Sequence, residues 1–189
     1  MIIDNTNLLI DADALLKLMD INKSTDEVIS IIKNLFEKLK RKALLHPLVY
    51  ANEIITKKHI LSQLIIQKII EVPTIEDIHS NDDIKKQIYI MYVSDFYHQL
   101  NAQPIPVVGD DILKYWNSHE SLGESHSVAT CVLNECDLFL SDDDDSKTLE
   151  KMVEERQMGT LRVYRRSEII DVEDAPELSR SEKRAIAHK

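Results

Sequence analysis

Two short apolar segments of the chain each end abruptly in acidic residues. Residues 8–10 are Leu-Leu-Ile and lead into Asp11 and Asp13, and residues 138–140 are Leu-Phe-Leu and lead, after one serine, into the aspartates 142–145. An apolar run of this length between polar flanks is typical of a strand buried on both faces. The pattern therefore predicts two core strands whose carboxyl ends carry acidic side chains.

Elsewhere the apolar residues follow helical spacing. The clearest helix, residues 24–39, begins at a capping box of Ser24 and Glu27. The basic residues Lys38, Lys40, Arg41 and Lys42 suit its end, and Pro47 suits the start of the next helix. Helix starts are also predicted at residues 74–77 and 80–83, further helices at 47–55, 83–100, 111–117, 121–135 and 147–158, and a third strand at 161–164. The β-branched run 65–72 fits a helix end or a strand equally well.

Strands separated by helices of ten or more residues pair in parallel, so the predicted fold class is α/β, with helices covering a central parallel sheet. The length of 189 residues favours one domain. We assign residues 1–170 to this domain and residues 171–189 to a polar tail that contains a short basic helix near 179–188.

The overall composition limits the classes of function. The chain has 33 acidic and 23 basic residues and a formal net charge of −10, which works against nonspecific attraction to nucleic acid or anionic membranes. It has only three glycines, Gly109, Gly123 and Gly159, so the glycine-rich phosphate loops of dinucleotide-binding and P-loop proteins are excluded.

Cysteine content and hydropathy indicate the compartment. Cys131 and Cys136 are the only cysteines and match no four-ligand zinc spacing, so we expect buried thiols in a reducing environment. No apolar stretch reaches the ~18 residues of a membrane span, and no signal-peptide pattern precedes the first strand. The expectation is a cytoplasmic protein without a membrane partner.

The acidic residues point to metal-dependent chemistry. Parallel strands deliver their carboxyl ends to one edge of a sheet, so Asp11 and Asp13 should face residues 142–145 there, joined by Glu124 from a helix start. Mutual repulsion would raise the pKa values of these carboxyls unless a cation is present. Mg²⁺ and Mn²⁺ favour carboxylate oxygens and phosphate groups, so the cluster suits hydrolysis of a phosphodiester bond.

Four motifs in this order resemble the PIN-domain nucleases. Residues 8–16 are similar to the opening motif of that family, and residues 46–55, His-Pro-Leu-Val-Tyr-Ala-Asn-Glu-Ile-Ile, to its second element. Residues 122–129 followed by 138–143 are similar to its third and fourth elements, in the version whose third motif is Gly-Glu. The resemblance spans residues 7–165. It implies a PIN-like three-layer α/β/α sandwich, with a helical insertion at about residues 56–105 relative to compact members.

The resemblance also implies roles for individual residues. Asp11, Glu53, Glu124 and Asp143 would form an acidic quartet around one or two Mg²⁺ or Mn²⁺ ions, with Asp13, Asp142 and Asp145 as further metal candidates. Ser141 would orient the last acidic pair by hydrogen bonding and border the substrate. The implied activity is a ribonuclease, including the toxin half of a toxin–antitoxin pair. The implied partners are an RNA substrate, a protein such as an antitoxin, and a second copy of the chain.

Each of these residues could also have a purely structural role. Glu124 could serve a capping box with Ser121, and residues 142–145 could be a solvated helix start. Glu53 could face solvent, and for His126 an exposed helix position is the favoured prediction over substrate contact. The basic residues Arg162, Arg165 and Arg166 could bind substrate phosphates or only be solvated.

Two other functions are consistent with the same pattern. The first is a catalytically weak or inert interaction module with the nuclease fold, which would bind a protein through the long middle helix or the basic tail. The second is a phospho-acceptor signalling domain, because receiver domains also cluster acids at strand ends beside Mg²⁺. Receivers require a lysine at a later strand end, where this chain has Arg165.

Overall fold

The computed structural model describes residues 1–20, 23–54, 58–116 and 121–170. These residues form one five-stranded sheet in which every pairing is parallel. Its spatial order is β3-β2-β1-β4-β5, and the strands are β1 (Asn7–Ile10), β2 (Lys42–Leu45), β3 (Ile70–Glu71), β4 (Leu138–Leu140) and β5 (Arg162–Tyr164). The predicted α/β class with a parallel central sheet is confirmed.

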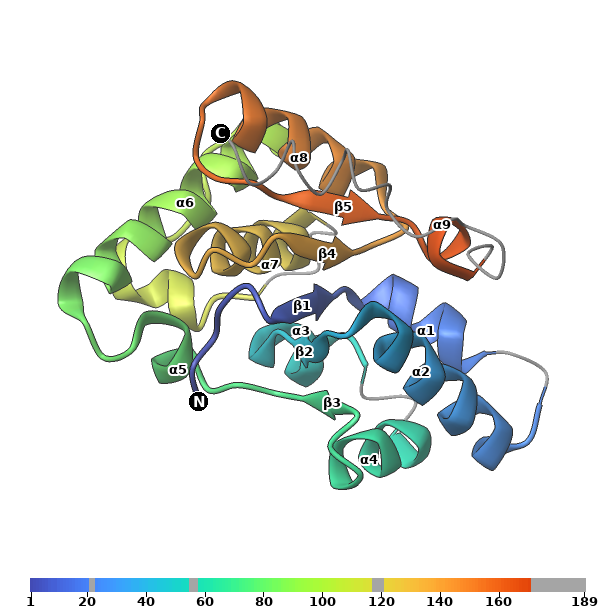
Figure 1. Cartoon of the computed structure of the whole chain (residues 1–189). Helices are drawn as coiled ribbons and strands as arrows, with labels where there is room; N and C mark the ends of the chain where they lie inside the picture. Colours follow the sequence, from blue (N-terminus) through green and yellow to red (C-terminus); the bar gives the residue numbers. More distant parts are fainter. Residues whose placement is uncertain (21–22, 55–57, 117–120, 171–189) are drawn as a thin grey trace.

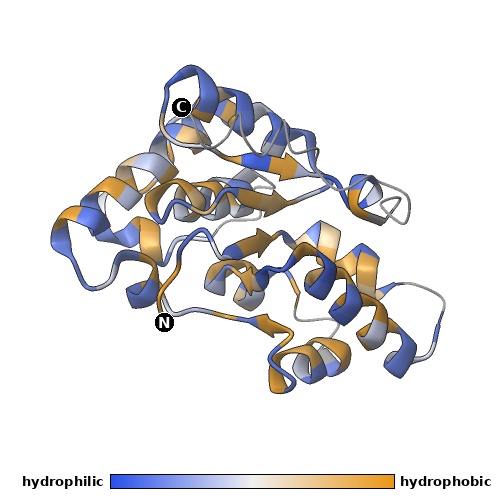
Figure 2. Cartoon of the chain, in the orientation of Figure 1, coloured by the Kyte–Doolittle hydropathy of each residue, from blue (hydrophilic) through white to orange (hydrophobic). Residues whose placement is uncertain are grey.

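Alternate residues of the central strands pack into two separate cores. Leu8 and Ile10 of β1 belong to one cluster of buried side chains, whereas Leu9 belongs to the other, together with Leu44 and Phe139. This alternation is the two-residue period of a strand that is covered on both faces. Figure 2 shows β1 and β4 as hydrophobic strands in the middle of the molecule.

Helices cover both faces of the sheet and complete a three-layer α/β/α sandwich (Figure 1). One face is covered by α1 (Ala12–Met19), α2 (Thr25–Leu39), α3 (Pro47–Asn52) and α4 (Lys58–Ile66). The other face is covered by α5 (Ile75–His79), α6 (Asp83–Asn101), the 3-10 helix η2 (Gly109–Leu113), α7 (Ser121–Leu133) and α8 (Asp144–Glu155). The short helix α9 (Arg166–Ile170) follows β5.

Local sequence signals explain where several helices begin. The capping boxes at Ser24 and Thr74 both form, with each hydroxyl accepting a hydrogen bond from the third helical residue. The helix that was expected to start at residues 80–83 is capped by Asp82. Ser80 instead adopts a left-handed conformation after α5. Side-chain caps satisfy otherwise unpaired N–H groups, which is why these signals work locally.

The structure adds elements that the sequence patterns did not indicate, among them strand β2 and the helices α1 and α9. Strand β2 lies between the end of α2 and the proline that opens α3, and helix α1 follows Asp11 directly. Residues 65–72, which fitted a helix end or a strand equally well, include both the end of α4 and the two-residue strand β3. Strand β3 therefore places part of segment 56–105 within the central sheet.

The ends of other predicted elements also differ. The helix expected at residues 111–117 is the 3-10 helix η2, and α8 begins at Asp144, three residues before the predicted Lys147. The basic helix predicted near residues 179–188 lies outside the described residues. Within the described ranges, no helix combines the length and hydrophobicity required to cross a bilayer.

The strand order creates a topological switch between β1 and β4. From β1 the chain passes to β2 on one side, whereas from β4 it passes to β5 on the other side. In open α/β sheets, ligands bind in the crevice at the carboxyl ends of the strands at such a switch point. Asp11 directly follows β1, and Asp142 and Asp143 follow β4 after one serine. The acidic residues therefore occupy the position where this architecture binds ligands.

Candidate active site

Ser141 connects the ends of β1 and β4. Its hydroxyl donates to Asp11 Oδ2 at 3.2 Å and accepts hydrogen bonds from the N–H of Asp143, at 3.2 Å, and from the hydroxyl of Ser146, at 2.8 Å. One donated and two accepted bonds use the full capacity of a serine hydroxyl. Ser141 is fully buried, and its hydrogen bonds join Asp11 and Asp143 and leave no free group for a substrate.

Asp11 and Glu124 form a buried pair of carboxyls. Asp11 is 1% exposed at the start of α1, and Glu124 is 6% exposed on α7. Burial, followed by the charge of nearby acids, raises the pKa of both groups, and the two side chains are hydrogen-bonded to each other. Two carboxyls can share a hydrogen bond only if one of them is protonated. The structure thus places two acids where both can ionise together only with a compensating positive charge.

Glu53 approaches this pair from the opposite helix, α3. Burial and then the charge of Asp13 raise its pKa to about 7. Its Oε1 atom lies 2.8 Å from the point where a Cβ on Gly123 would stand, so only glycine fits at position 123 without displacing Glu53. Gly123 of the Gly-Glu motif therefore leaves the space that Glu53 occupies, directly before Glu124 in the chain.

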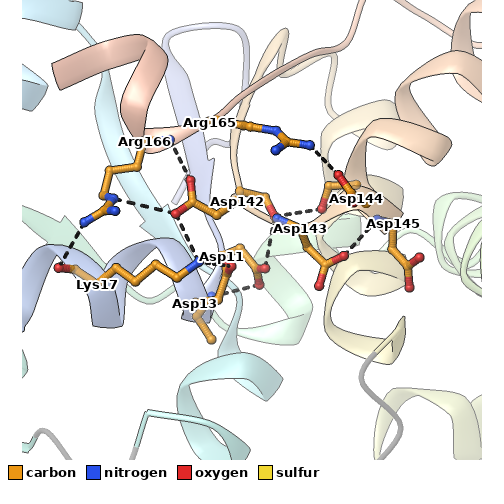
Figure 3. Close-up of polar contacts among 12 residues, drawn as sticks. Asp11, Asp13, Lys17, Asp142, Asp143, Asp144, Asp145, Arg165 and Arg166 are labelled. Atoms are coloured by element: carbon orange, nitrogen blue, oxygen red, sulfur yellow. Dashed lines mark hydrogen bonds and ion pairs between the residues drawn. The ribbon is translucent and has the colours of Figure 1, made fainter. Parts of the chain in front are cut away.

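The carboxyls nearer the surface are paired with cations (Figure 3). Lys17 Nζ lies 3.3 Å from Asp13 Oδ2 and 3.2 Å from Asp142 Oδ2, and the backbone N–H of Arg166 donates to Asp142 Oδ1 at 2.8 Å. Burial alone would raise the pKa of Asp142, but the Arg166 N–H and the charge of Lys17 outweigh it and hold that pKa below its usual value. Asp142 is thus a stabilised anion.

The aspartates after Asp142 cap helix α8. Asp143 accepts a hydrogen bond from the N–H of Asp145 at 2.8 Å, and its charge contributes to the raised pKa of Glu124. Asp144 is 88% exposed and pairs with Arg165. The alternative assignment of residues 142–145 to a helix start is therefore correct for the backbone, although Asp143 also faces the buried acids.

The acidic residues suit a metal ion by their chemistry but not by their arrangement in this structure. Among the residues that the structure describes, no group of three or more His, Cys, Asp or Glu side chains is arranged to hold a metal ion. The chemistry of the donor set nevertheless suits Mg²⁺ or Mn²⁺, because all donors are carboxylate oxygens. Glu124 Oε2 and Asp13 Oδ1 are buried and lack a hydrogen-bond partner in the described part of the chain.

The structure separates the three predicted arginines. Arg165 and Arg166 follow the carboxyl end of β5 and contact the aspartates at the acidic edge. Arg162 is exposed at the first residue of β5, which is the opposite edge of the sheet. Arg165 and Arg166 therefore remain candidates for phosphate contact, whereas Arg162 lies away from the acidic edge.

Two local predictions on α7 are wrong. Ser121 is the first helical residue rather than the residue that caps the helix, so the proposed capping box with Glu124 does not form. His126, for which an exposed position was favoured, is completely buried. The second error arises because α7 is buried on all sides from Ser121 to Cys131, a pattern that amphipathic spacing does not reveal.

Sequence reasoning missed three contributors to the site. Lys17 lies one helical turn after Asp13, a spacing that favours an ion pair and could have been recognised. The contact of Gly123 with Glu53 joins two distant segments and left no local signal. The third contributor is a set of buried aromatic and histidine side chains, which includes His46 from the second motif.

Comparison of the chain with protein-family models, with curated proteins and with solved structures finds no match. The resemblance to PIN-domain nucleases thus rests on the four sequence motifs alone.

Proposed function

We propose that this chain is a PIN-like nuclease that hydrolyses phosphodiester bonds of RNA with Mg²⁺ or Mn²⁺. The observation that carries the proposal is the buried pair of Asp11 and Glu124 at the switch point of the sheet. Burying two carboxyls side by side destabilises the fold, and carboxyls with such strongly shifted pKa values are found preferentially at functional sites. A divalent cation in this place would offset that charge.

Asp11, Glu124 and Asp143 would hold the metal ion or ions, with Glu53 as the fourth member of the acidic set. When bound, the metal would polarise a phosphate oxygen and make a water molecule more acidic. Ser141 would keep Asp11 and Asp143 in a fixed relative orientation through its hydrogen bonds. Asp13 would remain close to the set, with one oxygen held by Lys17.

Cations at the same edge would contact the nucleic acid. Lys17 and Arg166 lie beside Asp142, and Arg165 lies beside Asp144. These side chains could exchange their carboxylate partners for substrate phosphates, which are favourable partners for Arg and Lys. The choice of RNA over DNA, and a role as the toxin of a toxin–antitoxin pair, follow only from the family resemblance.

The proposal is tested by cleavage assays on single-stranded RNA and on DNA of the same sequence, with Mn²⁺, Mg²⁺ or EDTA. We expect metal-dependent RNA cleavage that falls at least about 100-fold in Asp11→Asn and in Asp143→Asn, because each change removes a metal-binding charge while an amide preserves the shape. The matched control is Asp95→Asn, on the half-exposed side of α6. Cleavage by Asp11→Asn at the rate of the unaltered protein would refute the mechanism.

A second candidate function is an inert interaction module. It is favoured by the exposed apolar side chains of Ile84 and Met91 on α6, which are 72% and 51% exposed. Titration calorimetry discriminates between the two functions: micromolar binding of Mn²⁺ that depends on Asp11 favours the nuclease, and no heat of binding favours the module. The phospho-acceptor alternative is disfavoured because receivers have the strand order 2-1-3-4-5, whereas this sheet has the order 3-2-1-4-5.

A further inference from the structure

Three completely or almost completely buried polar side chains form a hydrogen-bonded chain beneath the acidic edge. His46 Nε2 lies 2.9 Å from the hydroxyl oxygen of Tyr89, and that oxygen lies 2.7 Å from His126 Nδ1. The residues are at most 1% exposed and come from three separate parts of the fold: the start of α3, the middle of α6 and α7. None of them belongs to the proposed acidic set.

The position of one proton in this chain follows from the contacts. Burial lowers the pKa of both histidines. The N–H of Leu48 donates to His46 Nδ1 at 3.2 Å. A neutral imidazole carries one hydrogen, so His46 Nε2 must carry it and donate to the Tyr89 oxygen. The Tyr89 hydroxyl and His126 Nδ1 share the second hydrogen bond.

Each histidine sits on a helix that carries a glutamate of the site. His46 caps the start of the short helix α3, and Glu53 caps its end. Glu124 and His126 are two residues apart on α7, about 200° around a helix of 3.6 residues per turn. Glu124 therefore faces the acidic edge while His126 faces nearly the opposite side of the same helix. A bond that fixes His126 also fixes the rotation of α7, and with it the direction of Glu124.

A polar chain in this place has no advantage for stability alone. Apolar side chains of similar volume would fill the same space without any need for hydrogen-bond partners. Hydrogen bonds differ from apolar contacts in being directional, so they fix an orientation that packing alone leaves adjustable. The ring of Trp116 adds to this, because it stacks on His126 with ring centroids 6.0 Å apart and also borders Gly123.

We propose that Tyr89 is a positioning residue for the acidic site. Through its two hydrogen bonds to His46 and His126, its hydroxyl holds α3 and α7 in the arrangement that sets Glu124 against Asp11 and Glu53 against Gly123. The inference rests on the proposed function where it concerns metal binding. Its structural part, the fixed rotation of α7, can be tested without any metal.

The first test compares Tyr89→Phe with Tyr92→Phe in the full chain, using Mn²⁺ alone as the probe. Tyr92 is on the same helix and its ring packs against Phe96 outside the chain of hydrogen bonds, so it is a matched control. We expect Tyr89→Phe to remain folded by circular dichroism and to bind Mn²⁺ at least fivefold more weakly in paramagnetic resonance titrations. Tyr92→Phe should stay within twofold of the unaltered protein. A folded Tyr89→Phe with unchanged Mn²⁺ affinity would overturn the inference.

A second pair of variants separates hydrogen bonding from packing. His126→Asn keeps a hydrogen-bonding atom where Nδ1 lies, whereas His126→Leu does not. We expect Asn to retain Mn²⁺ affinity to within about threefold and Leu to lose as much as Tyr89→Phe. Retained Mn²⁺ affinity in His126→Leu would show that His126 acts only by filling space and would contradict the proposal.

The metal-free arm uses Trp116, the only tryptophan of the chain, as a reporter. Release of the His126 ring in Tyr89→Phe should raise the quenching of its fluorescence by iodide at least twofold, with no change in Tyr92→Phe. Failure of the unaltered protein to bind Mn²⁺ would refute the proposed function only. Unchanged quenching in Tyr89→Phe would refute the positioning role itself, whether or not Mn²⁺ binds.

Discussion

The carboxyls at the end of the sheet form two groups whose pKa values are shifted in opposite directions. The inner group, Asp11, Glu53 and Glu124, is buried or half-buried and has raised pKa values, caused by burial and by neighbouring acids. In the outer group, Asp142 has a lowered pKa because Lys17 and Arg166 contact it. All of these side chains are carboxyls at the same end of the sheet, so the difference comes from their partners.

The contrast shows which acids are available to a cation. Asp142 already has positively charged partners, and a metal ion there would have to displace them. The inner carboxyls have one another as neighbours, and a cation would relieve their repulsion. Four substitutions test this distinction between acids available to a cation and acids already paired. They are given in order of decreasing expected effect.

The largest effect is expected for Glu53→Gln on the pH dependence of stability without metal. A pKa raised from 4.5 to about 7 means that the folded protein binds more protons than the unfolded chain between these values, so Glu53 makes stability fall as pH rises through this range. We expect the free energy of unfolding of Glu53→Gln, taken relative to that of the unaltered protein, to rise by about 2 kcal/mol from pH 4 to pH 8. This value is reduced to allow for the partial exposure of Glu53. Urea unfolding at several pH values measures this gain. The control Glu154→Gln, on the exposed side of α8, should leave the pH profile unchanged.

The next effect concerns Gly123→Ala. The new methyl group would meet the tip of the Glu53 side chain, which can move aside, and alanine favours a helix over glycine by about 1 kcal/mol. We therefore expect unchanged or higher stability together with about tenfold weaker Mn²⁺ binding. In a Glu53→Ala background the same change should have no further effect on Mn²⁺ affinity, because the displaced group is already gone. Additive losses in the double variant would contradict the assigned contact.

Asp142→Asn probes the outer group and should have the opposite pH dependence. Because the pKa of Asp142 is lowered in the folded protein, its contribution to stability is present above the ordinary value of 3.8 and is lost as pH falls through the folded pKa. We expect the variant to be less stable by about 1 kcal/mol at pH 7 and equal to the unaltered protein near pH 2. Thermal unfolding at both pH values measures the difference. A loss that persists at pH 2 would indicate a packing defect instead.

The smallest effect is expected for Arg165→Ala. Its partner Asp144 is almost fully exposed, and exposed ion pairs contribute little because water and salt screen them. The free energy of unfolding should change by less than about 0.5 kcal/mol, and Asp144→Asn should match it. RNA affinity in Mg²⁺-containing buffer should nevertheless fall a few-fold in Arg165→Ala only. Equal RNA affinities in the two variants would argue against contact of Arg165 with phosphate.

Elements with strong local signals could be predicted from the sequence. The helix α2 has both a capping box and a complete apolar face, and it forms where it was expected. Strand β2 was missed because its residues, Lys-Ala-Leu-Leu, have no alternation and follow a helix closely. Its strand conformation depends on pairing with β1 and β3, which no local pattern encodes.

The candidate site, like the fold, could be predicted only in part. Asp11 could be predicted to lie at the carboxyl end of a buried strand, because a carboxylate next to an apolar run is costly to bury and is tolerated best where the strand ends. The burial of His126 and the distance of Arg162 from the acidic edge could not be predicted. Both depend on which side of a helix or which end of a strand meets the rest of the fold.

The sequence by itself determined the α/β class, the two strands that end in acids and the helices with capping signals, because these features depend on residues close together in the chain. Only the tertiary structure decided which acids are paired with cations, that Gly123 makes room for Glu53, and that Tyr89 joins two helices through buried histidines. Several of these contacts join residues far apart in the chain, such as Tyr89 and His126, 37 positions apart, and Lys17 and Asp142, 125 positions apart. Their energies depend on burial and on partners that are brought together only when the sheet and its covering helices have formed.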